Sequence, residues 1–174
     1  MKQLFFLRVQ AVGRCLSALM AAAVVAIAVA GCASSQERAE RREQTRRMVA
    51  EGIANRRLRI DVNSMSTLRY GTRMVSADFY VELKGDTLDS YLPYLGQVYH
   101  SPIVSTPQGL NFEAPVLAYT ESRPAADLTR IELYARTQED TFLYILEVYS
   151  NGKAYVRVRG QNRDAVSFDG DVNW

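Results

Sequence analysis

The last third of the chain alternates apolar and polar residues over three successive stretches, and this alternation most limits the folds open to it. The stretches are Leu128–Arg136, Thr141–Tyr149 and residues 153–159. Such a period of two predicts β-strands with one face buried. Asn151-Gly152 separates the last two stretches and is the strongest short hairpin signal, typical of a type I′ turn. With a final strand over residues 164–168, the sequence predicts a four-stranded antiparallel meander.

Earlier parts of the chain carry the same pattern. Alternation predicts strands over residues 58–63 and 77–84. Gly85-Asp86 then predicts a two-residue turn into a return strand over residues 87–92. These stretches therefore add a second antiparallel region to the meander.

Other segments break the pattern. Residues 64–76 are rich in Ser, Thr and Gly and predict a loop. Pro115 predicts an interruption between two short strands, over residues 110–112 and 116–119. Thr141–Tyr149 has apolar residues at both alternations, which predicts a central strand covered on both faces.

No alternation of strands with helices occurs, so a parallel sheet is excluded. Residues 33–57 are charged and free of proline, with a thin apolar stripe at Thr45, Val49 and Ile53, which predicts a helix. The predicted fold is α+β and mostly β. A charged N-terminal helix precedes one large curved antiparallel sheet, over residues 58–174, that can be partly closed into a barrel.

The first 31 residues have the pattern of a secretory leader. A positive segment precedes an almost wholly apolar run over residues 16–30. This run is short for a membrane-spanning helix, which needs about 20 residues. Val29-Ala30-Gly31-Cys32 then matches a bacterial lipobox. We expect cleavage between Gly31 and Cys32 and a lipid on the Cys32 sulfur.

The residues after Cys32 indicate a cellular location. Ala33 rather than aspartate follows the cysteine, as in lipoproteins sorted to an outer membrane, and residues 34–37 contain one acid only. We expect attachment to the outer membrane through the lipid, on the periplasmic face. Residues 32–57 then form a tether, whose arginines either contact anionic headgroups or belong to a solvated spacer.

Charge and cysteine content exclude several functions. The chain has 21 Lys and Arg against 19 acids, but the leader contains three of the basic residues, at Lys2, Arg8 and Arg14. The mature chain is therefore not basic, and no nucleic-acid partner is expected. Cys15 leaves with the leader and Cys32 is lipidated, so no thiol remains for a disulfide or a metal.

No residue cluster forms a catalytic motif. His100 is the only histidine, so a metal site would have few ligands besides carboxylates. A Ser-His-Asp site would require His100, and the sequence has no Gly-x-Ser-x-Gly elbow. Asp86, Asp89 and Glu82 surround the first hairpin turn, and a hydrolase would need two such carboxylates in a cleft. Turn aspartates more often bind backbone N–H groups. We expect no enzyme, no metal and no cofactor.

Tyrosine is abundant, with ten residues in the chain. Tyr91, Tyr94 and Tyr99 cluster around Pro93. They can form a recognition patch, because tyrosine is large, stiff and amphipathic. They can equally line half-buried sheet faces.

The chain resembles a family of lipoproteins found mainly in Bacteroidetes, the domain-of-unknown-function family 4251. The resemblance covers roughly residues 50–172 and rests on a Leu-Pro-Tyr-x-Gly element around Pro93, Gly85-Asp86, Asn151-Gly152, and Phe168 near Gly170. The resemblance implies a lipid-anchored protein of the cell envelope, and it implies no particular activity.

Three functions follow as expectations. The first is a lipid-anchored envelope module that binds a protein or has a structural role, without catalysis. The second is a lipocalin-like carrier of an apolar or glycan ligand. The third is a hydrolase that uses the carboxylates at the first turn.

Overall fold

The computed structural model of the chain describes residues 35–76, 78–96 and 110–174. The chain divides into two compact units, Met1–Glu43 and Gln44–Trp174. In the first unit, residues 35–43 are helical and Arg41 forms an ion pair with Glu37 one turn earlier, at 2.6 Å. The second unit begins with the helical residues 44–54 and contains all the strands of the described residues.

The second unit has nine strands along the described chain. They are β1 Arg57–Thr67, β2 Gly71–Met74, β3 Tyr80–Lys84, β4 Thr87–Leu92, β5 Leu110–Ala125, β6 Leu128–Arg136, β7 Thr141–Tyr149, β8 Lys153–Gly160 and β9 Val166–Asn173.

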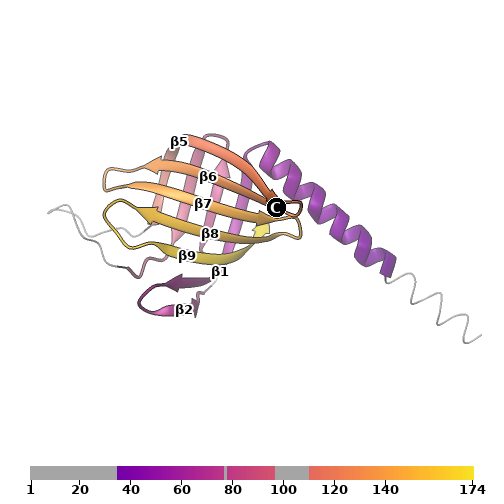
Figure 1. Ribbon diagram of the computed structural model, residues 1–174, viewed down its shortest axis with the longest axis horizontal. Helices are drawn as coiled ribbons and strands as arrows, with labels where there is room; N and C mark the ends of the chain where they lie inside the picture. The colour runs from indigo at the N-terminus through magenta and orange to yellow at the C-terminus, as the bar shows by residue number, and fades with distance from the viewer. Residues whose placement is uncertain (1–34, 77, 97–109) are drawn as a thin grey trace, which may run out of the picture. The chain divides into compact units, whose positions relative to one another are not determined.

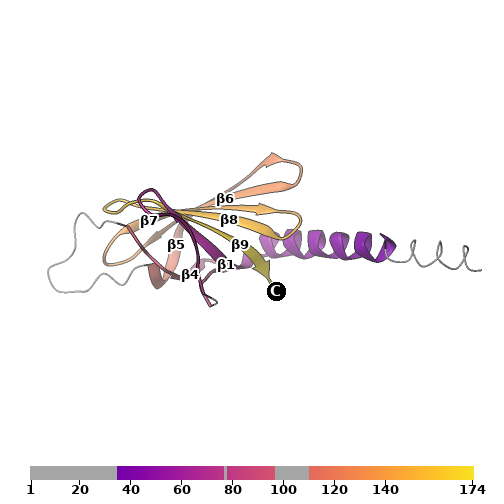
Figure 2. The same ribbon diagram turned by 90° about the horizontal axis from the view of Figure 1, so that it is seen from below.

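The strands form one antiparallel sheet that closes on itself (Figure 1, Figure 2). Along the sheet the order is β2-β1-β3-β4-β5-β6-β7-β8-β9, and β9 pairs back with β1. Eight strands therefore form a closed barrel, with β2 attached outside it along the distal half of β1. The mostly-β fold with a curved sheet is confirmed, and the closure is complete. Closure also removes free edges among the eight barrel strands, and the short β2 keeps one.

The interior of the barrel is filled by the inward-facing half of each alternation. Aromatic and branched side chains bury their apolar surface there, at roughly 25 cal/mol per Å² removed from water. The largest fully buried side chains are Tyr144, Phe142, Phe168, Ile60, Leu83, Leu88, Leu92, Leu110, Ile131, Leu133, Leu146 and Val81.

Helical residues 44–54 pack against the end of the barrel where β1 begins. Val49 and Ile53 are buried in the core cluster and Thr45 is half-buried, so the predicted apolar stripe is confirmed. Arg56 ends the helix with a left-handed φ of 50°. Its carbonyl accepts the N–H of Gly85 at 2.8 Å, which joins the helix end to the β3–β4 turn.

The opposite end of the barrel contains a buried ion pair. Arg163 Nε lies 3.2 Å from Asp140 Oδ2, and the two side chains are 3% and 0% exposed. The Asp140 carboxylate also accepts the backbone N–H groups of Thr141, Gln161 and Asn162, at 2.8, 3.1 and 3.3 Å. This one side chain therefore fixes the β6–β7 turn to the β8–β9 connection.

The prediction of a loop over residues 64–76 is wrong. Strand β1 continues to Thr67, and β2 returns beside it with Thr67 paired to Gly71. The small polar residues there are strand residues because β9, about a hundred residues later, supplies the pairing partners. The last strand is also longer than predicted, since β9 runs from Val166 to Asn173.

Pro115 does not interrupt the sheet. Strand β5 runs through it without a break from Leu110 to Ala125. Pro115 lies opposite Thr87 at the end of the β4–β5 ladder, and the β5–β6 ladder begins at Val116. Because Pro115 falls where one ladder gives way to the next, its missing N–H leaves the sheet intact.

Two expectations for the meander also need correction. Strand β7 is buried on one face only, since its outward residues Leu143 and Ile145 are half-exposed. The β7–β8 turn is not type I′, because Asn151 does not have a positive φ. Gly152 alone is left-handed, at φ 86°, and its N–H donates to the carbonyl of Tyr149 at 2.9 Å. This is the three-residue hairpin loop that ends in a left-handed glycine.

We predict that Gly152→Ala lowers the free energy of unfolding by about 1–2 kcal/mol, the cost of a left-handed residue with a side chain. An added Cβ would also lie 3.3 Å from Thr45 Cγ2. Urea denaturation measures the change. Gly152→Asn is the matched control, since asparagine tolerates left-handed φ. If both variants lose equal stability, contact with Thr45 rather than φ determines the cost.

Candidate functional site

Several predicted site residues lie outside the part of the chain that the structure describes. They are Gly31 and Cys32 of the lipobox, Tyr99 of the tyrosine patch, and His100. Lipidation and cleavage at Cys32 therefore stay predictions.

Tyr91 and Tyr94, the other two residues of the predicted patch, have different surroundings. Tyr91 lies on the outer face of β4 and is 43% exposed, with its ring stacked 5.4 Å from Phe79. Tyr94 packs against the core, and its hydroxyl donates to the carbonyl of Asp164 at 3.2 Å. The ring of Tyr94 lies 5.4 Å from the guanidinium of Arg163. Tyr91 is thus available to a partner, whereas Tyr94 covers the buried ion pair.

The three carboxylates at the first turn lie on the outside of the barrel, each beside a cation. Asp86 is 2.7 Å from Arg56, and its side chain is 82% exposed. Glu82 and Asp89 share Lys84, at 3.3 and 3.0 Å. Lys84 thus forms ion pairs with both carboxylates, which favours a structural role.

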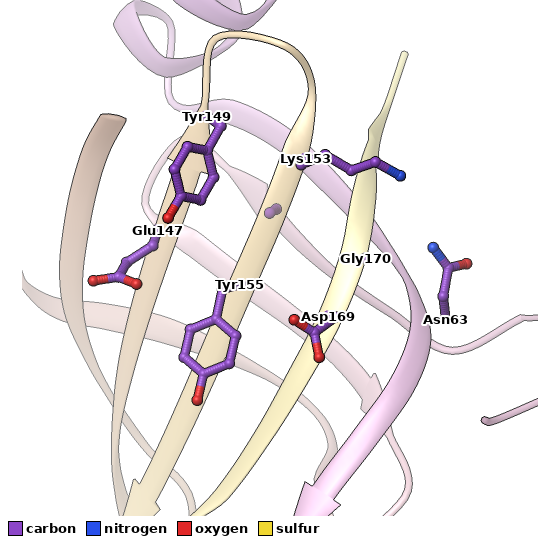
Figure 3. Close-up of a pocket in the computed structure, with 8 residues that line it drawn as sticks. Asn63, Glu147, Tyr149, Lys153, Tyr155, Asp169 and Gly170 are labelled. Atoms are coloured by element: carbon purple, nitrogen blue, oxygen red, sulfur yellow. The ribbon is translucent and has the colours of Figure 1, made fainter. Parts of the chain in front are cut away.

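A hollow on the outer face of β7, β8, β9 and β1 brings together residues that sequence reasoning did not select (Figure 3). We call it the tyrosine hollow. It encloses about 530 Å³, and Tyr149 and Tyr155 both contribute rings to it. Its lining residues are Asn63, Glu147, Tyr149, Lys153, Ala154, Tyr155, Asp169 and Gly170.

Strand register positions these side chains. Glu147 pairs with Tyr155 across the β7–β8 hairpin, and Tyr155 pairs with Asp169 across β8 and β9. Since directly opposed residues in a sheet point to the same face, the three form one outward row. Counting outward from the predicted two-residue turn would have paired Glu147 with Val156, so the row depends on the three-residue loop that the structure shows.

Polar partners fix the charged groups of the tyrosine hollow. The Oε1 atom of Glu147 accepts two N–H groups of Arg130, at 3.0 and 2.6 Å. Asp169 accepts the hydroxyl of Ser64 at 3.1 Å, and Lys153 lies 2.7 Å from Asp171. The carboxylates are therefore oriented before any ligand arrives, which reduces the entropy lost on binding.

The hydrogen bond from Lys153 lowers the pKa of Asp171, and a second one from Asn63 at 2.7 Å acts in the same direction, while partial burial opposes both. Because the pKa of Asp171 is lower in the folded than in the unfolded chain, its ionised carboxylate stabilises the fold at pH values above the unfolded-state pKa. The contribution disappears as the pH falls through the folded-state pKa. The Asp171 carboxylate, beside the tyrosine hollow, therefore stays paired with Lys153 at neutral pH.

Residues 40–172 match the model of a protein family described as Domain of unknown function (DUF4251). The chain belongs to the DUF4251 family. The matched range runs from the charged helix to the end of β9, and the family resemblance predicted from the sequence is confirmed.

A crystal structure of another DUF4251 family protein, from Bacteroides eggerthii DSM 20697, has a similar fold. The TM-score is 0.56 at 11% sequence identity, and the match covers 74% of this chain and 86% of that chain. This likeness establishes the shared fold alone. No curated protein matches the chain.

Two further features are absent from the described part of this DUF4251 chain. Its residues include no group of three or more His, Cys, Asp or Glu side chains that could hold a metal ion. No helix among the described residues is long and apolar enough to span a membrane. The tyrosine hollow, with aromatic faces beside ordered hydrogen-bonding groups, is therefore the arrangement on which we base a function.

Proposed function

We propose that this DUF4251 chain is a lipid-anchored, non-catalytic binding module of the cell envelope that recognises a neutral glycan at the tyrosine hollow. The observation that carries the proposal is the pairing of Tyr149 and Tyr155 with Glu147 and Asp169 on the outside of a filled barrel. Pockets that combine aromatic faces with a few oriented polar groups are typical ligand sites.

The chemistry of the tyrosine hollow suits a sugar. Sugar rings have apolar C–H faces, which tyrosine rings can cover, and hydroxyl groups around their edges. Glu147 and Asp169 supply acceptors, and Lys153 supplies a donor. Because Arg130 and Asp171 balance two of these three charges, a neutral ligand fits better than a strongly charged one.

The alternative functions have less support. A carrier with its ligand inside the barrel would need interior space. The inward-facing positions hold fully buried aromatic and branched residues instead, among them Tyr144 and Phe168. A hydrolase would need two carboxylates in a cleft. Of the three at the first turn, only Glu82 lines a hollow, and there it is paired with Arg59 and Lys84. Neither alternative has an arrangement comparable to the tyrosine hollow.

The glycan proposal predicts that Tyr155→Ala weakens binding of a neutral N-acetylglucosamine oligomer at least about tenfold, because truncating a central aromatic contact costs more than about 1.4 kcal/mol. Isothermal titration calorimetry of the full chain, in a detergent without sugar headgroups, measures the affinity. Tyr134→Ala is the matched control, since Tyr134 is an outward tyrosine on β6 that does not line the tyrosine hollow.

Equal weakening by both variants would place binding outside the tyrosine hollow. Absence of binding by the unmodified chain to neutral oligomers would refute the glycan assignment.

The anchor has its own test. We expect Cys32→Ser to abolish labelling by radioactive fatty acid and to leave the leader uncleaved, because lipid attachment precedes cleavage at a lipobox. Gel mobility and labelling of the full chain in cells measure both effects. Cys15→Ser is the control, and it should leave labelling unchanged. Labelling that persists in Cys32→Ser would refute the lipobox.

A further inference from the structure

The β1–β2 hairpin exposes large apolar side chains, two in its turn at residues 68–70 and one at the end of β2. Leu68 is 96% exposed, Met74 80% and Tyr70 56%. We call residues 68–74 the hairpin tip. Three such residues in one short hairpin are unusual for a surface that faces only water, and exposed apolar patches mark sites of contact.

The hairpin tip is also positively charged. Arg69 and Arg73 are exposed, and no acidic residue occurs between Asp61 and Asp78. The guanidinium of Arg73 lies 5.5 Å from the ring of Tyr70, so cation and aromatic ring are side by side. The partner of this surface is therefore expected to be negatively charged as well as apolar.

The hairpin tip is ordered and stands apart from the barrel wall. Strand β3 covers β1 only as far as Asp61, and β2 takes its place from Ser64 onward, outside the barrel (Figure 1). The Ser66 and Thr72 hydroxyls lie 2.6 Å apart across the hairpin, and the N–H of Tyr70 donates to Thr67 at 3.2 Å. These bonds hold the apolar side chains outward in a defined conformation.

We propose that the hairpin tip inserts into the headgroup region of an anionic phospholipid bilayer. Leu68, in the turn, enters the acyl boundary, and Tyr70 lies at the interface, where tyrosine is enriched. Arg69 and Arg73 extend their charged ends to the lipid phosphates. A protein partner fits less well, because protein interfaces bury about 800 Å² per partner. A four-residue β2 is also a poor template for an added strand.

This proposal is independent of the glycan site and of the lipid on Cys32, since neither involves the hairpin tip. The test uses the full chain with Cys15→Ser, Cys32→Ser and Leu68→Cys, labelled at residue 68 with an environment-sensitive fluorophore. Preformed vesicles contain phosphatidylcholine alone or with phosphatidylglycerol, and a spin label on the acyl chains quenches an inserted fluorophore. Thr120→Cys, labelled likewise on exposed β5, is the control.

We expect quenching at residue 68 in the anionic vesicles and none at residue 120. Arg69→Gln with Arg73→Gln should lower the insertion equilibrium about 30-fold, because each arginine near an anionic surface contributes about a fivefold factor. Three results would overturn the proposal. They are an unquenched label at residue 68, equal quenching in neutral vesicles, and a fluorescence shift that grows with protein concentration without lipid, which would mean a second copy covers the tip.

Discussion

Asp140→Ala is expected to lower the free energy of unfolding by about 3–5 kcal/mol, the usual effect of removing one partner from a buried ion pair. The guanidinium of Arg163 stays inside the barrel end, with its side chain 3% exposed, and loses a carboxylate at 3.2 Å. The backbone N–H groups of Thr141, Gln161 and Asn162 lose their acceptor in the same substitution. Urea denaturation followed by circular dichroism measures the change.

The matched control replaces both partners. Asp140→Leu combined with Arg163→Met should recover the part of the loss that comes from an unpaired buried guanidinium, while the three backbone N–H groups still lack their acceptor. Glu139 lies 3.5 Å from Arg163 and offers a second carboxylate. A loss below about 1 kcal/mol in Asp140→Ala would mean that Glu139 replaces Asp140, and the prediction would then be wrong.

Gly170→Ala is expected to cost about 2–3 kcal/mol, within the range of overpacked interiors. A Cβ at this position would overlap the carbonyl oxygen of Asp61 and lie 3.2 Å from Ile60 Cγ2. Backbone atoms block the added methyl group, so β9 must move away from β1. Gly170 is paired with Val62, next to a bulge in β1.

Hydrogen exchange distinguishes this mechanism from a general loss of packing. In Gly170→Ala, the amides of the β1–β9 ladder should exchange faster than those of the β6–β7 ladder after correction for global stability. Gly71→Ala is the control, because a Cβ there has no neighbour within 4 Å and only its φ of 65° is unfavourable. Uniform exchange across both ladders would contradict a local opening at the barrel closure.

Local pattern predicted much of the fold, because the hairpins β3–β4 and β6 to β9 use neighbouring strands and turn residues that are visible in the sequence. The same reasoning wrongly predicted a loop over residues 64–76, because their pairing partner β9 is remote in sequence. The break predicted at Pro115 was wrong because a proline is tolerated where the β4–β5 ladder ends and the β5–β6 ladder begins. The position of that change depends on the register of both ladders.

The candidate site was harder to predict for a related reason. Tyr91 and Tyr94 are close in sequence, yet one faces outward and the other packs against the core. Tyr149 and Tyr155 lie on opposite sides of a turn and meet on one face through register. Proximity along the chain is therefore a weak guide to a surface site in a β-barrel, and the cross-strand neighbour is the better one.

The pairing of β9 with β1 has a consequence for how the protein is made. The closing ladder joins residues about a hundred positions apart, so the barrel depends on contacts of high sequence separation, which generally fold slowly. A chain made from its N-terminus delivers β1 early and β9 last. Until β9 arrives, β1 and β8 each have an open edge that could pair with another chain. The chain is therefore most prone to aggregation while it is being made. This period ends when β9, the final eight-residue strand, closes the barrel.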